Sequence, residues 1–361
     1  MFRRLTHVVP IGNLFVGGDY PIRVQSMINV PTQNITSTLQ QIRKLYEARC
    51  EIIRIAVPNS SSANALLKIR TQLQKDKIHV PLVADIHFSP SIAMACVPYV
   101  DKIRINPGNF DEKFDTFRPL VKAIKKEGKT IRIGVNRGSL NKNILAHYGN
   151  TAEGMYHSAL PFLQIAAEEN FKNIVLSFKS SNVSKMVEDH RIILPKFDLL
   201  SFNFPVHLGI TEAGNENYGR IKGAIGIGSL LLDGIGDTIR VSLTEDPINE
   251  IAIAYDILQA CDRRSTHAEY IACPSCGRTQ FDIQRVFNEI KEKTSHLNDI
   301  KIAVMGCIVN GIGEMGDADF GYVGTGLGKI NLYRRGQCVK VNIPEQNAVE
   351  ELLKLIESCK E

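Results

Sequence analysis

The feature that most constrains the fold is a strand-then-helix pattern that repeats eight times between Ile22 and Cys261. Runs of β-branched and aliphatic residues alternate with segments of helical period throughout this part of the chain. The strands are predicted at residues 22–28, 52–57, 80–86, 102–106, 130–135, 173–178, 205–211 and 237–243. An amphipathic helix is predicted after each of them, near residues 34–48, 61–76, 89–97, 113–127, 151–169, 181–195, 218–232 and 247–261.

Strands that alternate with helices specify a parallel sheet, because each helix must carry the chain back to the same edge. Eight such rounds in roughly 250 residues are typical of a closed (β/α)8 barrel of the TIM type. A doubly wound open sheet is the alternative. The segment before Ile22 contains turn residues, Gly12, Gly17, Gly18 and Pro21, and is predicted to form a small hairpin that plugs the lower end of the barrel.

The pattern ends after Cys261, which predicts a second domain. Helices are expected at residues 281–295 and 345–359, extended segments at 301–306 and 319–324, and a hairpin at 330–342 that turns at Arg335 and Gly336. These elements make a smaller α+β domain. The expected boundaries are 1–262 for the barrel and 263–361 for the second domain, with the charged segment 262–267 as the linker.

Composition limits the possible partners and the compartment. The chain has 361 residues, 44% of them hydrophobic, and a formal net charge of +5. This excess is too small and too scattered to indicate a nucleic-acid surface. No apolar run is long enough to span a bilayer, and the first residues do not resemble a signal peptide. We therefore expect a cytoplasmic protein whose eight cysteines stay reduced.

Polar side chains alternate with aliphatic ones along the predicted strands. In a parallel barrel, such polar residues point into the lumen, and the upper strand ends form the mouth of the active site. The residues concerned are Arg54, Lys102, Arg104, Asn106, Arg132, Asn136, Lys179, Arg240 and Ser242, with Asp85, His87 and Glu212 at strand ends. Burying so many cations is costly unless a counter-charge arrives, and a bound diphosphate supplies one.

Ion pairs within the lumen are the alternative explanation for these residues. Asp85 could pair with Arg54, and Glu212 could pair with Lys179. The whole set contains more cations than carboxylates, which favours a site for an anionic ligand. Asp85, His87 and Glu212 are the proton carriers expected at the mouth, and each is a candidate general acid.

Three cysteines suggest a metal site in the second domain. Cys273 and Cys276 form a C-x-x-C pair, and Cys307 opens a glycine-rich turn after the strand predicted at 301–306. Gly306, Gly311 and Gly313 would let the backbone approach a bulky inorganic cluster.

The fourth ligand distinguishes the candidate metals. A structural zinc site would need another cysteine or histidine at matching spacing, and neither His267 nor His296 lies in such a motif. Three cysteines and an oxygen ligand suit a [4Fe–4S] cluster, and Glu314 lies in the same turn as Cys307. The spacing therefore favours a cluster, with zinc as the alternative.

Taken together, the motifs resemble one family, the 4-hydroxy-3-methylbut-2-en-1-yl diphosphate synthases of the non-mevalonate isoprenoid pathway. The segments that resemble the family's barrel are residues 24–27 (VQSM), 81–88, 104–109, 131–136, 207–214 and 234–243, and those that resemble its cluster domain are 272–278 and 306–314. These segments are distributed along nearly the whole length of the chain, and together they are much more specific than a single C-x-x-C pair.

The resemblance implies a set of site residues. Cys273, Cys276, Cys307 and Glu314 would bind a [4Fe–4S] cluster, with Asn310 close to it. The diphosphate would be held by Arg54, Arg104, Arg132, Asn136, Lys179, Arg240 and Ser242, with His87 at the same mouth. Glu212, with Asp85 nearby, would supply a proton, and Glu314 would yield its place on the iron to the substrate.

The resemblance also implies the reaction. Two electrons, delivered singly by flavodoxin or ferredoxin, would open the ring of 2-C-methyl-D-erythritol 2,4-cyclodiphosphate and expel one oxygen as water. The product would be (E)-4-hydroxy-3-methylbut-2-en-1-yl diphosphate. The family's homodimers place the cluster of one subunit over the barrel of the other, so a homodimer is expected here.

The chain departs from the family pattern at a few positions. Ile28, Val30 and Asn34 stand where two threonines and an aspartate are usual, although Asn34 is still expected to cap a helix. Ile312 replaces the usual proline before Gly313.

Two other classes of protein are the alternatives to this family. A radical adenosylmethionine enzyme would need a C-x-x-x-C-x-x-C motif, which the sequence lacks. A zinc-stabilised barrel that binds a phosphorylated ligand would lack redox chemistry.

Overall fold

The computed structural model describes residues 2–110 and 114–359, apart from the side chain of Asn310. The chain forms two compact units, Met1–Arg264 and Ser265–Glu361. The sequence had predicted the boundary two residues earlier, between residues 262 and 263. Each unit has its own hydrophobic core, so each is described separately.

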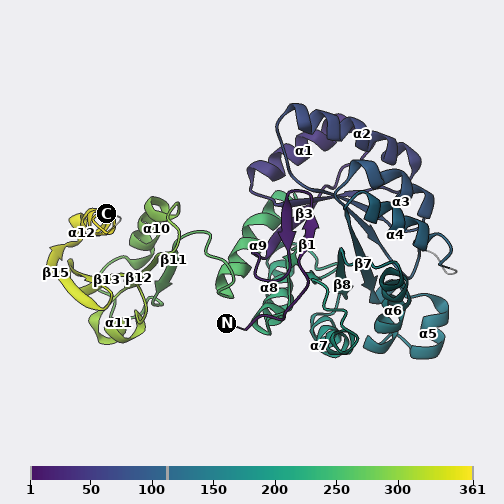
Figure 1. The fold of residues 1–361 in the computed structure, drawn as a ribbon. Helices are drawn as coiled ribbons and strands as arrows, with labels where there is room; N and C mark the ends of the chain where they lie inside the picture. Colours follow the sequence, from purple (N-terminus) through teal and green to yellow (C-terminus); the bar gives the residue numbers. More distant parts are fainter. Residues whose placement is uncertain (1, 111–113, 360–361) are drawn as a thin grey trace. The chain divides into compact units, whose positions relative to one another are not determined.

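The first unit contains a parallel barrel (Figure 1). Its strands are β3 (Arg23–Met27), β4 (Ile52–Ala56), β5 (Leu82–Ile86), β6 (Lys102–Ile105), β7 (Thr130–Asn136), β8 (Ile174–Lys179), β9 (His207–Leu208) and β10 (Thr238–Ile239). The sheet order is β8-β7-β6-β5-β4-β3-β10-β9, and a parallel bridge between Leu176 and Val206 joins its two ends. The predicted (β/α)8 barrel is therefore confirmed, and the open sheet is wrong.

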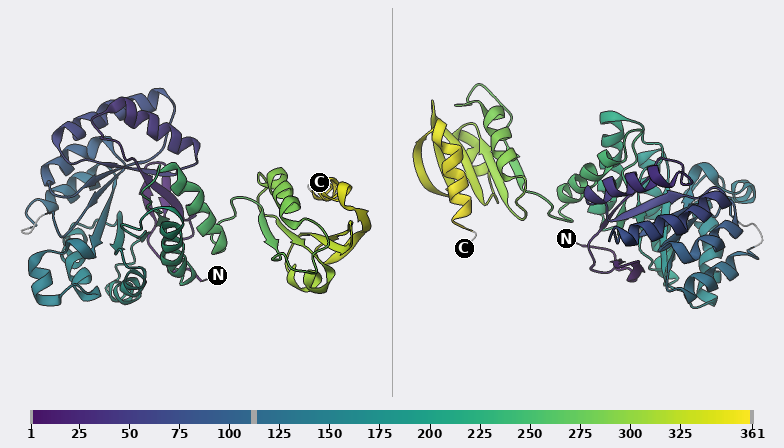
Figure 2. Two further views of the ribbon diagram at one scale, coloured as in Figure 1. Left: turned by 180° about the vertical axis from the view of Figure 1, so that it is seen from behind. Right: turned by 90° about the horizontal axis from the view of Figure 1, so that it is seen from above.

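Helices follow the strands and surround them in both views of Figure 2. They are α1 (Ile35–Glu47), α2 (Ser60–Lys75), α3 (Pro90–Cys96), α4 (Phe117–Lys126), α5 (Lys142–Tyr148), α6 (Ala152–Glu168), α7 (Val183–Leu199), α8 (Glu216–Leu232) and α9 (Ile248–Ala260). The side chain of Asn34 caps α1 as predicted, because it accepts a hydrogen bond from the backbone N–H of Ser37. The start of the helix predicted at 113–127 falls partly outside the described residues.

Three predictions of element length were wrong. The helix predicted to stop at residue 195 continues through Pro195 to Leu199, because Phe197 on that last turn is fully buried. The strands predicted at 205–211 and 237–243 contain only two hydrogen-bonded residues each, β9 and β10.

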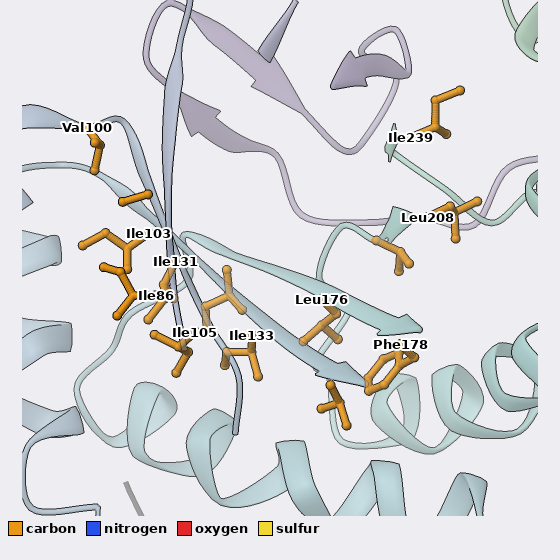
Figure 3. Close-up of a cluster of buried hydrophobic side chains, with 14 of the residues drawn as sticks. Ile86, Val100, Ile103, Ile105, Ile131, Ile133, Leu176, Phe178, Leu208 and Ile239 are labelled. Carbon is orange, nitrogen blue, oxygen red and sulfur yellow. The ribbon is translucent and has the colours of Figure 1, made fainter. Parts of the chain in front are cut away.

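Strand side chains alternate as the sequence predicted. Figure 3 shows Ile103, Ile105, Ile131 and Ile133 on β6 and β7, and all belong to the core between the strands and the helices. The residues between them, such as Arg104, therefore face the lumen.

The N-terminal hairpin closes the lower end of the barrel. β1 (Val9–Ile11) pairs antiparallel with β2 (Leu14–Val16). Val9, Ile11 and Val16 form one apolar cluster with Ile52, Val83 and Val175, which lie at or near the N-terminal ends of β4, β5 and β8. The predicted plug is confirmed.

The second unit is an α+β domain with a five-stranded sheet. The sheet order is β11 (Glu269–Ala272), β12 (Lys301–Met305), β13 (Phe320–Gly326), β14 (Lys329–Arg334) and β15 (Gln337–Pro344), and the helices are α10 (Ile283–Thr294), α11 (Ile308–Glu314) and α12 (Glu345–Glu357). The first three strands are parallel, and the last two form the predicted hairpin. The sequence did not predict β11. Among the described residues, no helix is both long and apolar enough to cross a bilayer.

Candidate functional site

Basic side chains from neighbouring strands converge in the barrel lumen. Arg54 lies on β4, Arg104 on β6, Arg132 on β7 and Lys179 at the end of β8. Arg104 and Arg132 are direct register partners. Arg104, Arg132 and Lys179 are buried, at 3%, 1% and 5% exposure. The alternation of polar and aliphatic residues thus correctly predicted a cationic lumen.

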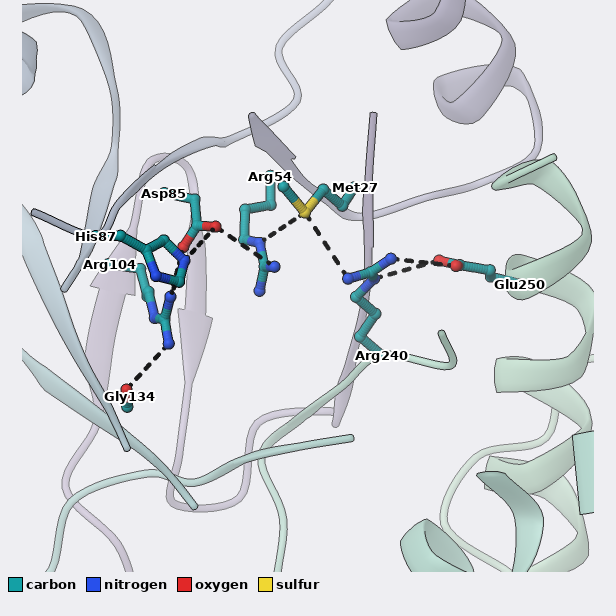
Figure 4. Close-up of polar contacts among 8 residues, drawn as sticks. All are labelled: Met27, Arg54, Asp85, His87, Arg104, Gly134, Arg240 and Glu250. Atoms are coloured by element: carbon teal, nitrogen blue, oxygen red, sulfur yellow. Dashed lines mark hydrogen bonds and ion pairs between the residues drawn. The ribbon is translucent and has the colours of Figure 1, made fainter. Parts of the chain in front are cut away.

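Asp85 lies between Arg54 and Arg104 of this group (Figure 4). One of its oxygens accepts a hydrogen bond from Arg104 Nη1 at 3.1 Å, and the other lies 3.6 Å from Arg54 Nη2 and 3.3 Å from His87 Nε2. Arg104 also donates to the carbonyl oxygen of Gly134 at 3.0 Å. The ion pair between Asp85 and Arg54, one of the predicted alternatives, is therefore present.

The charges around Asp85 determine its protonation. Burial raises the pKa of its carboxyl group, but Arg54 and Arg104 outweigh burial and hold the pKa well below the usual value. Burial also lowers the pKa of Arg54 to about 10, which leaves this guanidinium protonated at neutral pH. Asp85 is thus an anionic partner of two arginines.

A second carboxylate holds Arg240 on the opposite side of the lumen. Glu250, on α9, accepts hydrogen bonds from Arg240 Nε at 3.3 Å and from Arg240 Nη2 at 3.2 Å. The sulfur of Met27 lies between the two nearby guanidiniums, 3.0 Å from Arg54 Nε and 3.8 Å from Arg240 Nη1. Sequence reasoning missed Met27 and Glu250, and the helical position of Glu250 gave no signal of contact with the lumen.

Several buried donors in the lumen have no partner among the described residues. They are Lys102 Nζ, Arg104 Nε, and Arg132 Nε and Nη1. Burial, and then the charge of Arg132, lowers the pKa of both Lys102 and Lys179 well below the usual value. Buried polar groups in proteins normally have a hydrogen-bond partner, so these donors indicate a site for an anion.

Two further lumen residues were missed from the sequence. Gln25 on β3 and His207 on β9 are buried, and both have side-chain atoms without a partner in the described structure. His207 Nδ1 does share a hydrogen bond with Thr238 Oγ1 at 2.8 Å. Alternation along β3 and β9 could have identified both, because the residues that flank them are aliphatic or small.

The remaining predicted residues lie at the rim. Asn136 and Glu212 line a pocket of about 360 Å³ at the ends of β7 and β8, and Glu212 is exposed. Ser242 is half-buried and follows β10. Within the described part of the chain, no ion pair joins Glu212 to Lys179, so this alternative is wrong.

Two of the cysteines lie at one edge of the second unit's sheet. β11 and β12 are parallel with Ala272 opposite Val304, so Cys273 and Cys307 both follow the carboxyl ends of neighbouring strands. The backbone N–H of Gly306 donates to Cys273 Sγ at 3.1 Å. Cys276 is exposed, and the backbone N–H of Arg278 lowers the pKa of its thiol.

The position of Glu314 differs from the prediction. The segment predicted as a turn is the helix α11, with Cys307 as its N-cap and Glu314 as its last residue. Because a helix rises 1.5 Å per residue, Glu314 lies about 10 Å along the axis from Cys307. Among the described residues, no three Cys, His, Asp or Glu side chains are close enough to hold a metal ion. The side chain of Asn310 lies outside the described structure.

The donor types nevertheless fit an iron–sulfur cluster. Three thiols and one carboxylate are the ligands that the resemblance implies. The backbone N–H of Gly306, which donates a hydrogen bond to Cys273 Sγ, is the kind of donor that stabilises a thiolate ligand. The chain therefore combines a TIM barrel whose lumen suits an anion with a separate α+β domain in which Cys273, Cys276 and Cys307 are candidate cluster ligands.

This combination agrees with the protein-family models that the chain matches. Residues 6–255 match the GcpE TIM-barrel domain, and residues 269–358 match the GcpE protein C-terminal domain. The chain therefore belongs to the GcpE family. The matched segments leave out only the ends of the chain and a short stretch around the junction of the two units.

Relatives that cover nearly the whole chain agree with this assignment. A protein of Prochlorococcus marinus subsp. pastoris is 47% identical over 98% of this chain and 93% of its own length. A protein of Synechococcus sp. (strain JA-3-3Ab) is 48% identical over 99% of this chain and 92% of its own length. Both are named 4-hydroxy-3-methylbut-2-en-1-yl diphosphate synthase (ferredoxin). The family resemblance inferred from the motifs is confirmed.

Proposed function

We propose that this chain is an oxidoreductase that converts 2-C-methyl-D-erythritol 2,4-cyclodiphosphate to (E)-4-hydroxy-3-methylbut-2-en-1-yl diphosphate and water. The names of its full-length relatives support this activity. The observation that carries the proposal is the excess of buried cations in the lumen, where Lys102 and Arg132 have donors without partners in the described structure. A diphosphate supplies the negative charge that such a group lacks.

The lumen residues would bind and orient the substrate. Arg104 and Arg132 are register partners near the middle of the barrel, and Arg54 and Arg240 flank them on the β4 and β10 sides. Lys179, Asn136, Ser242 and His87 would complete the contacts to the diphosphate. Guanidinium groups suit this task because they donate pairs of hydrogen bonds to phosphate oxygens.

Cys273, Cys276, Cys307 and Glu314 would hold a [4Fe–4S] cluster, with Asn310 nearby. When bound, such a cluster supplies electrons one at a time to the substrate. The relatives' names support ferredoxin as the electron donor, and flavodoxin is the alternative. We further propose a cytoplasmic homodimer in which each active site needs both subunits.

Glu212 would donate the proton that leaves with the expelled oxygen. Its side chain is exposed at the rim, in the pocket that Asn136 also lines, so it can exchange protons with solvent. Asp85 is held as a carboxylate by Arg54 and Arg104, so it has no proton to give in the free protein. We assign Asp85 instead to holding these arginines before the substrate arrives.

The test is anaerobic purification, followed by visible absorption and iron and sulfide assays. We expect a brown protein with about four irons per chain. Cys307→Ser should lose this colour, whereas Cys338→Ser, at an exposed cysteine on β15, should keep it. The brown protein should then convert the cyclodiphosphate with reduced ferredoxin. A colourless protein that holds stoichiometric zinc after reconstitution would contradict the proposal.

A further inference from the structure

Both oxygens of the buried Glu250 carboxylate accept hydrogen bonds from donors inside the protein. Glu250 is 2% exposed. Its Oε2 accepts hydrogen bonds from Ser26 Oγ at 2.7 Å and Arg240 Nε at 3.3 Å. Its Oε1 accepts from Arg240 Nη2 at 3.2 Å and from the backbone N–H of Leu243 at 3.1 Å. Each oxygen thus has two donors, and no acceptor capacity remains for other groups.

This arrangement fixes the direction of the Arg240 guanidinium. Two of its three nitrogens donate to Glu250, and within the described residues the hydrogen-bond partner of the third, Nη1, is the sulfur of Met27, at 3.8 Å (Figure 4). A thioether sulfur is a weak acceptor. Nη1 is therefore available to a stronger acceptor in the lumen, and Glu250 determines which edge of Arg240 faces that acceptor.

Glu250 also reaches Arg240 from outside the strand layer. It belongs to α9, whereas Ser26 lies on β3 and Arg240 follows β10, and these two strands are paired. The carboxylate therefore links one helix to two adjacent strands beneath the mouth. Because the carboxylate lies on the far side of the guanidinium from Met27, it does not compete with a ligand for Nη1.

We propose that Glu250 is a positioning residue, which orients Arg240 so that Nη1 donates to a phosphate oxygen of the substrate. This inference rests on the proposed function, because it assumes a diphosphate ligand in the lumen. Met27 gives Nη1 and Arg54 Nε a neutral contact with a weak acceptor. The diphosphate replaces that contact with charge-assisted hydrogen bonds, which are stronger.

Glu250→Gln tests the proposal in the anaerobically purified full-length protein. The glutamine side chain has the same shape as glutamate, but one of its two oxygens is replaced by an NH2 group. Because that group donates rather than accepts, glutamine cannot accept hydrogen bonds from both Nε and Nη2 of Arg240. We expect the Kd for inorganic pyrophosphate, measured by calorimetry, to rise at least about tenfold. In the cyclodiphosphate assay, KM should rise while kcat changes little. The matched control is Glu245→Gln, which breaks a pair with Arg220 and should leave the Kd unchanged.

A double-mutant cycle separates positioning from a general structural role. If Glu250 acts through Arg240, Glu250→Gln should cause no further loss of pyrophosphate affinity in the Arg240→Gln background. If circular dichroism shows that Glu250→Gln is unfolded, Glu250→Asp replaces it, because it keeps the charge but shortens the reach. A folded variant with unchanged affinity, or additive losses in the cycle, would overturn the inference.

The pyrophosphate measurement distinguishes this inference from the proposed function. It needs no turnover and no electron donor. Wild-type protein that fails to bind pyrophosphate and fails to convert the cyclodiphosphate would count against the proposed function. Wild-type protein that does both, with a Glu250→Gln variant that binds equally well, would overturn only the role of Glu250.

Discussion

Replacement of Asp85 by asparagine tests whether the lumen needs a negative charge. The Asp85 carboxylate is 6% exposed and lies within 3.1 Å of Arg104 and 3.6 Å of Arg54. Its removal leaves two largely buried guanidiniums without their counter-charge. Loss of one partner of a buried ion pair costs about 3–5 kcal/mol. For a domain of this size, about 2–4 °C of melting temperature per kcal/mol gives a decrease on the order of 10 °C.

Calorimetric melting with and without pyrophosphate measures this effect. The melting temperature of Asp85→Asn should lie well below that of the wild type in anion-free buffer. Saturating pyrophosphate should narrow the difference, because the ligand then supplies the missing charge. An equal melting temperature without anion, or a difference that pyrophosphate does not change, would refute the reasoning. Asp76→Asn, at a surface pair with Arg43, should change little.

The ion pairs of Asp85 with Arg54 and Arg104 also predict that the stability of the protein depends on pH. The arginines hold the pKa of Asp85 well below the ordinary value of 3.8 despite burial, which acts in the opposite direction. The stability that Asp85 contributes is therefore present above about pH 4 and is lost as the pH falls through the folded pKa. The difference in melting temperature between wild type and Asp85→Asn should shrink only in this acid range.

Three further substitutions test other parts of the site. Glu212→Gln should keep the cluster and pyrophosphate binding but lower product formation about 100-fold; unchanged turnover would contradict its role as an acid. Lys102→Met removes a buried amine without a partner in the described lumen, so calorimetry should show a higher melting temperature for the anion-free protein. The difference in melting temperature between Lys102→Met and the wild type should shrink as the pH rises towards the ordinary lysine pKa. A variant that melts at a lower temperature than the wild type would contradict the prediction. Gly209→Ala would place a Cβ 2.6 Å from the carbonyl oxygen of Arg240 and should cost about 1–3 kcal/mol in urea unfolding. Gly228→Ala, in α8 with no contact tighter than 3.5 Å, is its control and should be neutral or stabilising by up to about 1 kcal/mol.

The barrel was predictable because its signal is local. Aliphatic residues recur with the period of a strand or a helix in every round, and the order of rounds then specifies a parallel sheet. The helix α5 was missed because none of its residues is buried, so it has no hydrophobic period. The helix α7 was predicted too short because proline usually ends a helix, whereas burial of Phe197 favours its last turn.

The site was only partly predictable because some of its contacts depend on packing. Alternation along single strands was enough to place Arg54, Arg104 and Arg132 in the lumen. Nothing local indicates that Glu250 reaches Arg240, because that contact depends on how α9 packs beside β3 and β10. The glycines near Glu314 suggested a turn, but the backbone there forms the hydrogen bonds of a helix.

The hairpin of β1 and β2 closes one end of the barrel, so the lumen can be entered from the other end alone. Since Val9, Ile11 and Val16 fill the lower end, a ligand that enters the lumen leaves through the opening by which it came. Entry of substrate and release of product must then alternate at one opening. A single cover over that opening would be enough to keep bulk water away from a reactive ligand.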